Sequence, residues 1–247
     1  MDTAASRKEC NQLFYGSLFS GIGGMDLGFD RAGLKCAWQV EIDPYARRVL
    51  ERHWPEVPKH DDIRTFTNIP YVDIVCGGFP CQDISYAGNG AGLGGARSGL
   101  FYEAMRVVRE VGPRIVVLEN VAALLTRGLD QVLGTLASLG FDAEWDCLPA
   151  SSFGASHYRN RIFVVATNAN CEGFQRRPQE HGQSTETHAK QPRLPIERHG
   201  GWAIEPDVGR VAYGVPGRVD RIRGLGNAVV PQVAEFIARH VAAQIKP

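Results

Sequence analysis

Short apolar runs alternate with amphipathic stretches along the first 167 residues of the chain. The runs rich in β-branched residues predict strands, and the stretches with apolar positions three and four residues apart predict helices. This alternation is typical of an α/β fold in which helices flank a parallel sheet. The predicted strands are 13–20, 35–41, 72–76, 114–119, 141–148 and 161–167, and the predicted helices are 24–32, 44–53, 99–111 and 130–139.

The pattern changes abruptly after residue 167. From 168 to about 206 the chain is rich in Gln, Arg, His, Pro, Glu and Gly and has few large aliphatic residues. Such a segment predicts a loop-rich or partly disordered insert. Order is expected to resume at about Trp202. Residues 231–245 then predict a closing helix, because Val233, Ile237 and Val241 fall on one face.

The charge and cysteine content of the chain exclude only a few classes of function. The 247 residues carry 27 basic and 27 acidic side chains, so the whole chain gives no argument for a polyanionic partner. Residues 150–247 nevertheless hold 13 basic and 8 acidic side chains, which fits a polyanion-binding half. The six cysteines form no CxxC pair, so we expect free thiols and no zinc site. Without a membrane-spanning run or a signal core at 1–11, we expect a cytoplasmic protein.

A glycine-rich turn, Phe19-Ser20-Gly21-Ile22-Gly23-Gly24, follows the first predicted strand and opens the first predicted helix. Glycines let a ligand approach the backbone, and a helix N-terminus offers unpaired N–H groups. Glu41 ends the second strand, where a carboxylate can accept the hydroxyls of a ribose, and Asp62 is placed to meet an adenine amino group. Taken by itself, each of the two acids is better explained as a solvated loop residue.

The segment Gly77-Gly78-Phe79-Pro80-Cys81-Gln82 follows the predicted strand 72–76, at the sheet edge where α/β folds bind ligands. A lone loop cysteine is by default an incidental thiol. Framed by Gly and Pro, Cys81 is instead a candidate nucleophile. Cys76 lies inside the apolar strand, and we expect it in the core.

Charged groups follow two further predicted strands. Glu119 ends the apolar run 115–118, so we expect a raised pKa and a carboxyl able to donate a proton. Arg159 and Arg161 open the strand 161–167, and positions two apart on a strand share a face, so both guanidiniums can reach one site. The alternatives are a solvent-facing Glu and a basic strand end.

Taken together and in this order, the segments FSGIGG, GGFPCQ, ENV, HYRNR and GNAVVP resemble those of the C5-cytosine DNA methyltransferases. The resemblance covers residues 13–167 and about 206–245. It implies a Rossmann-like S-adenosylmethionine-dependent methyltransferase fold with a small, loop-rich target-recognition region. We therefore expect a catalytic and cofactor-binding domain at 1–167, a reduced target-recognition region at 168–218 and a C-terminal segment at 219–247 that returns to the first domain.

The resemblance also implies roles for individual residues. Cys81 matches the nucleophile that adds to carbon 6 of a flipped-out cytosine, and Glu119 matches the acid at N3 of the base. Arg159 and Arg161 match the pair that holds the base and the loop around it. The residues expected to contact DNA are Gln82, Ser85 and Arg97.

The cofactor implied by the resemblance is S-adenosyl-L-methionine. Two positions depart from the family pattern: His157 stands where Gln is usual, and Ile42 replaces a common aromatic residue beside the adenine. The residues expected to bind the cofactor are Phe19, Gly21, Gly23, Glu41, Ile42, Asp62, Ile63, Pro80, Leu100, Asn227 and Val229.

Double-stranded DNA is the implied substrate, and a cognate restriction endonuclease is the implied partner in a restriction-modification system. We expect a monomer with no membrane partner. Two alternatives stay open at this point. A tRNA cytosine-5 methyltransferase would use the same nucleophile, and a non-catalytic relic of the family would bind DNA without methylating it.

Overall fold

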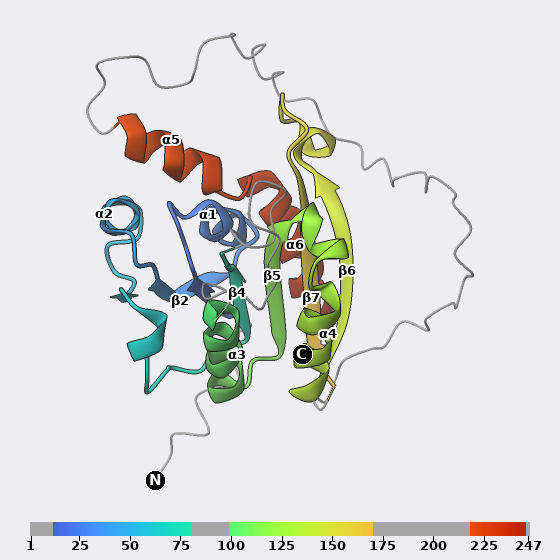
Figure 1. The fold of residues 1–247 in the computed structure, drawn as a ribbon. Helices are drawn as coiled ribbons and strands as arrows, with labels where there is room; N and C mark the ends of the chain where they lie inside the picture. The colour runs from blue at the N-terminus through green and yellow to red at the C-terminus, as the bar shows by residue number, and fades with distance from the viewer. Residues whose placement is uncertain (1–11, 81–98, 170–217, 246–247) are drawn as a thin grey trace.

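The computed structural model describes residues 12–80, 99–169 and 218–245. Its centre is a seven-stranded sheet with the strand order β3-β2-β1-β4-β5-β7-β6 (Figure 1). The first strand, β1, therefore lies inside the sheet, with β2 and β3 on one side of it and β4 to β7 on the other. The strands are β1 (Phe14–Leu18), β2 (Lys35–Val40), β3 (Lys59–His60), β4 (Ile74–Gly78), β5 (Ile115–Val121), β6 (Phe141–Pro149) and β7 (Asn160–Asn168).

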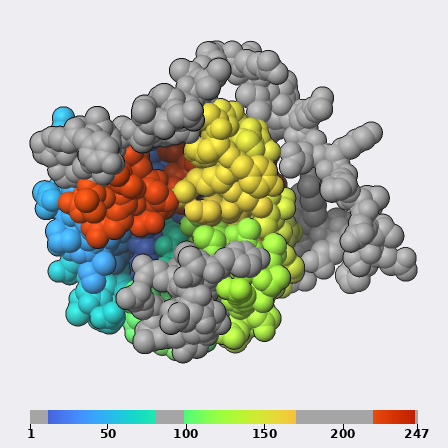
Figure 2. Space-filling view, turned by 45° about the horizontal axis from the view of Figure 1, so that its top comes forward, coloured from blue at the N-terminus to red at the C-terminus, as the bar shows by residue number. Residues whose placement is uncertain are grey.

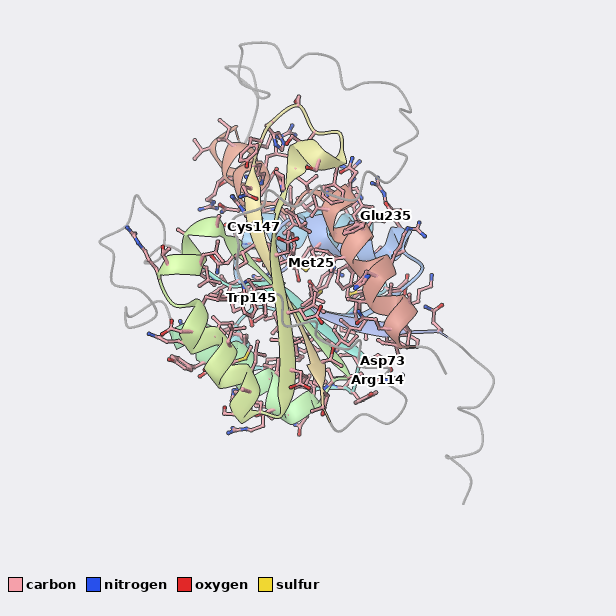
Figure 3. All side chains as sticks on the ribbon, turned by 90° about the vertical axis from the view of Figure 1, so that its right-hand side faces the viewer. Met25, Asp73, Arg114, Trp145, Cys147 and Glu235 are labelled. Atoms are coloured by element: carbon pink, nitrogen blue, oxygen red, sulfur yellow. The ribbon has the colours of Figure 1, made fainter. Side chains whose placement is uncertain are left out.

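Helices cover both faces of this sheet and bury one apolar cluster on each. Buried residues of α3 (Gly99–Val111) and α4 (Leu129–Ser138) pack on one face. Those of α1 (Gly24–Arg31) and α6 (Pro231–Gln244) pack on the other. Figure 3 views the molecule from the β6 edge, where Trp145 and Cys147 are labelled, and shows α4 and α6 on opposite sides. The helix α2 (Pro44–His53) begins at Asp43, whose carboxylate accepts hydrogen bonds from the first backbone N–H groups of the helix.

The expectation of a wholly parallel sheet is wrong for one strand. β7 runs antiparallel to both β5 and β6, whereas the β1, β2, β3, β4 and β5 pairings are parallel. The connection from β6 to β7 contains only the short 3-10 helix at Ala150–Phe153. A connection this short joins antiparallel neighbours, because a parallel return needs a longer crossover.

The C-terminal helix packs closely on the first helix because glycines line the contact. A β-carbon at Gly28 would lie 2.5 Å from the β-carbon of Ala234 and 2.6 Å from the carbonyl oxygen of Pro231. At the start of α1, a β-carbon at Gly24 would lie 2.3 Å from the carbonyl oxygen of Val229. The far end of the chain is therefore held against the glycine-rich turn, as the sequence predicted.

Five elements in the described residues were not predicted: the two-residue strand β3, the 3-10 helices at Ile63–Thr65, Ala122–Thr126 and Ala150–Phe153, and the helix α5 (Arg218–Asn227). The expected insert at 168 to about 206 lies almost wholly outside the described residues, so its loop-rich character stays a prediction. None of the helices in the described ranges has the length and apolar character needed to span a membrane.

Candidate active site

A cavity of about 330 Å³ opens at the carboxyl ends of the central strands. Its lining combines the turn after β1 with residues that follow β2, end β4 and β5, and lie between α5 and α6. Figure 2 shows the corresponding hollow between α5 (orange-red) and the chain around residues 150–160 (yellow). Parallel strands bring their carboxyl ends to one edge, so segments far apart in the sequence meet here.

The turn after β1 has an unusual backbone path. Phe19 and Gly21 have φ values of 53° and 56°, in the left-handed region that favours glycine. The Glu41 carboxylate fixes this turn to the end of β2, because its Oε2 accepts from the N–H of Gly21 and its Oε1 from the N–H of Asp43, both at 2.7 Å. Each carboxylate oxygen keeps a second acceptor site. Glu41 can therefore hold the turn and still accept a hydrogen bond from a ligand in the cavity.

Five other predicted residues line the same cavity: Ile42, Asp62, Ile63, Pro80 and Leu100. Asp62 begins the 3-10 helix at Ile63–Thr65, where its Oδ1 accepts from the N–H of Arg64 at 3.0 Å. Ile63 is buried, whereas Ile42 is 62% exposed and forms part of the rim. At this side the cavity thus combines the carboxylates of Glu41 and Asp62 with an apolar wall.

Glu119 is a buried carboxyl at the deep end of the cavity. Its Oε1 lies 3.1 Å from Nε of Arg161. Burial raises the pKa of Glu119 to about 7, although Arg161 and Arg159 act in the opposite direction. The predicted upward shift is therefore present, and near neutral pH this group can both hold and release a proton.

Arg159 and Arg161 do not share a strand face as predicted. Arg159 precedes β7 and has a φ of 24°, so the alternation of a strand does not apply to it. Its guanidinium donates to the carbonyl oxygens of Gly226 and Ala228, each at 2.8 Å. Arg161 lines the cavity and Arg159 does not, although both arginines line an adjoining hollow beside the end of α5. Arg159 thus holds the end of α5 and the first residue after it.

Asn227 at the end of α5 and Val229 in the linker to α6, both expected to bind the cofactor, line the cavity. Sequence reasoning missed the helix α5 itself, whose Arg223 forms an ion pair with Asp43 across the cavity rim. Gly224 of α5 packs against Ile22 of the glycine-rich turn. The two halves of the rim are therefore connected by a contact between residues far apart in the sequence.

The remaining predicted residues lie elsewhere. Gly23 does not line the cavity, and a β-carbon there would meet the indole of Trp54 at 2.4 Å, so Gly23 serves packing. Cys76 is fully buried in β4, as expected. Cys81, Gln82, Ser85 and Arg97 fall outside the described residues, and their roles stay predictions.

Curated relatives match about two thirds of the chain. It is 35% identical over 162 residues to the type II methyltransferase M.DsaV of Dactylococcopsis salina, covering 64% of this chain and 46% of the relative. It is 33% identical over 175 residues to M.HhaI of Haemophilus parahaemolyticus, covering 68% and 54%. The chain thus spans about half the length of these relatives.

Solved structures share the fold. The Dnmt2 methyltransferase of S. pombe gives a TM-score of 0.54 at 22% identity, over 64% of this chain and 51% of that one. The Entamoeba histolytica methyltransferase EhMeth gives 0.54 at 16%, over 70% and 57%. The model of the C-5 cytosine-specific DNA methylase family matches residues 14–205, most of the chain. The chain therefore belongs to the C-5 cytosine-specific DNA methylase family.

Proposed function

We propose that this protein is a DNA (cytosine-5)-methyltransferase that uses S-adenosyl-L-methionine. One observation carries the proposal. The Glu119–Arg161 pair and the carboxylates of Glu41 and Asp62 line a single cavity. Pro80, which lines it too, directly precedes Cys81 in the sequence.

The residues around the cavity fit a nucleoside-type cofactor. Carboxylates at Glu41 and Asp62 suit the hydroxyls of a ribose and the amino group of an adenine, which are hydrogen-bond donors. Apolar side chains at Ile63, Pro80 and Leu100 suit the faces of a planar base. A β-carbon at Gly21 would meet no atom within 4 Å, so the backbone of the turn is open to a ligand. Bound there, S-adenosylmethionine would supply a methyl group activated by its positive sulfur.

The chemistry of cytosine explains the need for the other residues. Carbon 5 of the ring is a weak nucleophile until a thiolate adds to carbon 6, and we assign that addition to Cys81. Negative charge develops on the ring as the bond forms, and the Glu119 carboxyl relieves it by donating a proton to N3. Carbon 5 then takes the methyl group. Loss of its hydrogen as a proton to water restores the double bond and expels the Cys81 thiolate, and the proton on N3 returns to the Glu119 carboxylate.

In this scheme Arg161 both positions Glu119 and contacts the base. Its guanidinium holds the Glu119 carboxyl in place and, because it lines the same cavity, can donate hydrogen bonds to the base. A paired base in a duplex cannot reach a recessed cavity, so we propose that the target cytosine is flipped out of the stack. Gln82, Ser85 and Arg97 are proposed to contact the DNA, and residues 168–218 to read the sequence around the target.

A methyl-transfer assay with mixed-sequence duplex DNA and tritiated cofactor tests the proposal. We expect label in DNA, methylated cytosines on bisulfite sequencing, and no label with Cys81→Ser. Duplex DNA containing 5-fluorocytosine should trap a covalent complex, because fluorine cannot leave as a proton, and the matched variant Cys76→Ser should still be trapped. Label in tRNA alone would contradict a DNA substrate, and DNA binding without transfer would indicate a non-catalytic relic.

A further inference from the structure

A buried acid that the proposed chemistry does not use lies behind the cavity. Asp26, in the first turn of α1, has 0% exposure. Its Oδ2 accepts from the hydroxyl of Ser17 at 3.1 Å, and its Oδ1 accepts from the side-chain amide of Gln39 at 2.7 Å. A carboxyl that accepts at both oxygens has the arrangement of an ionised carboxylate.

Two serine hydroxyls connect this carboxylate to the cavity. The Ser20 hydroxyl lies 2.9 Å from the hydroxyl oxygen of Ser17, which in turn donates to Asp26. Ser17 and Ser20 both line the cavity, while Asp26 does not. Ser20 sits between Phe19 and Gly21, the two residues with left-handed backbone conformations. The chain of hydrogen bonds thus ends in the turn that we assign to the cofactor.

Keeping a charge at this position is unfavourable for the fold. Its three side-chain partners, Ser17, Gln39 and Cys36, are all uncharged. Burial raises the pKa of Asp26 to about 6, and hydrogen bonds from Gln39 and Ser17 lower it again. The carboxyl is therefore largely ionised above pH 7. Lys59 is near enough to interact electrostatically with Asp26, but no cation is among the side chains that hydrogen-bond to the carboxylate. A buried charge without a hydrogen-bonded cation, next to a binding cavity, suggests a role towards the ligand.

We propose that Asp26 is a positioning residue that makes the cavity prefer a positively charged ligand, because its carboxylate orients the Ser17 and Ser20 hydroxyls with their oxygens toward the cavity. The inference rests on the proposed function. The methyl donor carries a sulfonium charge, and its product S-adenosylhomocysteine is a neutral thioether at the same sulfur. The acid would thus favour binding of the donor and release of the product.

The charge can be removed with little change of shape in Asp26→Asn. The Asn oxygen still accepts from Gln39, but the Asn NH₂ donates to Ser17 in place of accepting from it. Ser17 must then turn its own hydrogen away from residue 26, whereas Ser20 can keep donating to the backbone carbonyl oxygen of Ser17, which lies 3.2 Å away. Coulomb's law gives roughly a tenfold change in affinity for unit charges ~10 Å apart at an effective dielectric constant of ~20. We expect the affinity ratio of donor to product to fall several-fold at pH 8.

The experiment measures binding of both S-adenosylmethionine and S-adenosylhomocysteine by titration calorimetry, without any turnover. Asp30→Asn is the matched control, since Asp30 accepts from Tyr15 and Trp54 and does not line the cavity. Ser17→Ala cuts the connection while keeping the acid, and we expect it to lower the ratio as well. If Asp26→Asn does not fold, the Ser17→Ala variant alone tests the inference.

The outcomes separate the inference from the proposed function. If the unmodified protein binds neither compound, the proposed cofactor is wrong. If it binds both, and the variants weaken both equally or leave both unchanged, the cofactor site stands and the role of Asp26 is overturned. A ratio lowered in Asp26→Asn and Ser17→Ala, and unchanged in Asp30→Asn, supports the inference.

Discussion

Gly78 lies directly opposite Glu119 on the neighbouring strand, and a β-carbon there would come within 2.7 Å of Oε2 of Glu119. The adjacent Gly77 faces the other way, where a β-carbon would lie 2.4 Å from the carbonyl oxygen of Leu18. Two consecutive glycines at the end of β4 thus have different tasks. Gly78 makes room for the carboxyl proposed to donate a proton, and Gly77 lets β1 and β4 pair.

We predict that Gly78→Ala lowers methyl transfer by about ten- to a hundredfold, because a small displacement of an aligned reacting group has effects of that order. The fold should survive, since the clash is with the end of a side chain. Gly77→Ala should instead destabilise the protein, because it clashes with backbone. The control is Gly134→Ala in α4, because a β-carbon at this position would meet no atom within 4 Å. This substitution should stabilise the helix by about 0.5–1 kcal/mol. Thermal melts and initial rates distinguish these results, and equal rates in the Gly78 and Gly134 variants would contradict the assignment.

The pKa of Glu119 predicts how the rate depends on pH. Because burial raises this pKa to about 7, the protonated form needed for donation to N3 is lost as pH rises through about 7. The rate of the chemical step should therefore fall on the alkaline side of pH 7. Glu119→Gln keeps a hydrogen-bond donor that does not titrate, so its slower rate should lack this alkaline limb. Single-turnover rates from pH 6 to 9 test this, and the same limb in both proteins would assign it to another group.

Arg159 should affect cofactor binding although it does not line the cofactor cavity. It holds the carbonyl oxygens of Gly226 and Ala228, on either side of Asn227, which does line it. Hydrogen bonds from a charged group contribute about 1.5–3 kcal/mol, and part of this holds the segment in place. We predict that Arg159→Ala raises the dissociation constant of S-adenosylmethionine by about tenfold. Arg109→Ala, an exposed change on α3, should not, and equal calorimetric affinities in the two variants would exclude this role of Arg159.

Much of the central fold was accessible from the sequence because strands β1, β2, β4, β5, β6 and β7 are continuous apolar or alternating runs. The position of Glu119 after such a run also sufficed to predict its raised pKa. The direction of β7 could not be read from its apolar residues, since the pattern within a strand is the same in either orientation. The helix α5 was missed because it contains Gly224 and Gly226, each of which disfavours a helix by about 1 kcal/mol.

The partner of Arg159 depends on a contact between distant parts of the chain. Its guanidinium contacts Gly226 and Ala228, which lie 67 and 69 positions further along the chain. No local sequence pattern encodes a contact over such a separation. The same holds for Arg223 and Asp43, which are 180 positions apart. The sequence therefore located the residues of the cavity better than it located their partners.

The buried charge of Asp26 leads to a last prediction, about stability. The pKa of this group is 3.8 in its ordinary state and about 6 in the folded protein, so the folded state binds a proton more tightly than the unfolded chain. The group is therefore unfavourable for folding above pH 6, and this cost disappears as pH falls from about 6 to about 4. Two pKa units correspond to about 3 kcal/mol.

Asp26→Asn cannot ionise and should be free of that cost. We predict that the difference in unfolding free energy between the variant and the unmodified protein shifts in favour of the variant by about 2 kcal/mol between pH 4.5 and pH 8. Using the difference removes the contribution of Glu119, which is present in both proteins. Urea unfolding at four pH values measures it. A constant difference across this range would mean that folding leaves the pKa of Asp26 unchanged and that its charge costs the fold nothing. A difference that still widens by about 1.4 kcal/mol per pH unit at pH 8 would mean that Asp26 stays neutral in the folded protein, and it would remove the basis for its electrostatic role at the cavity.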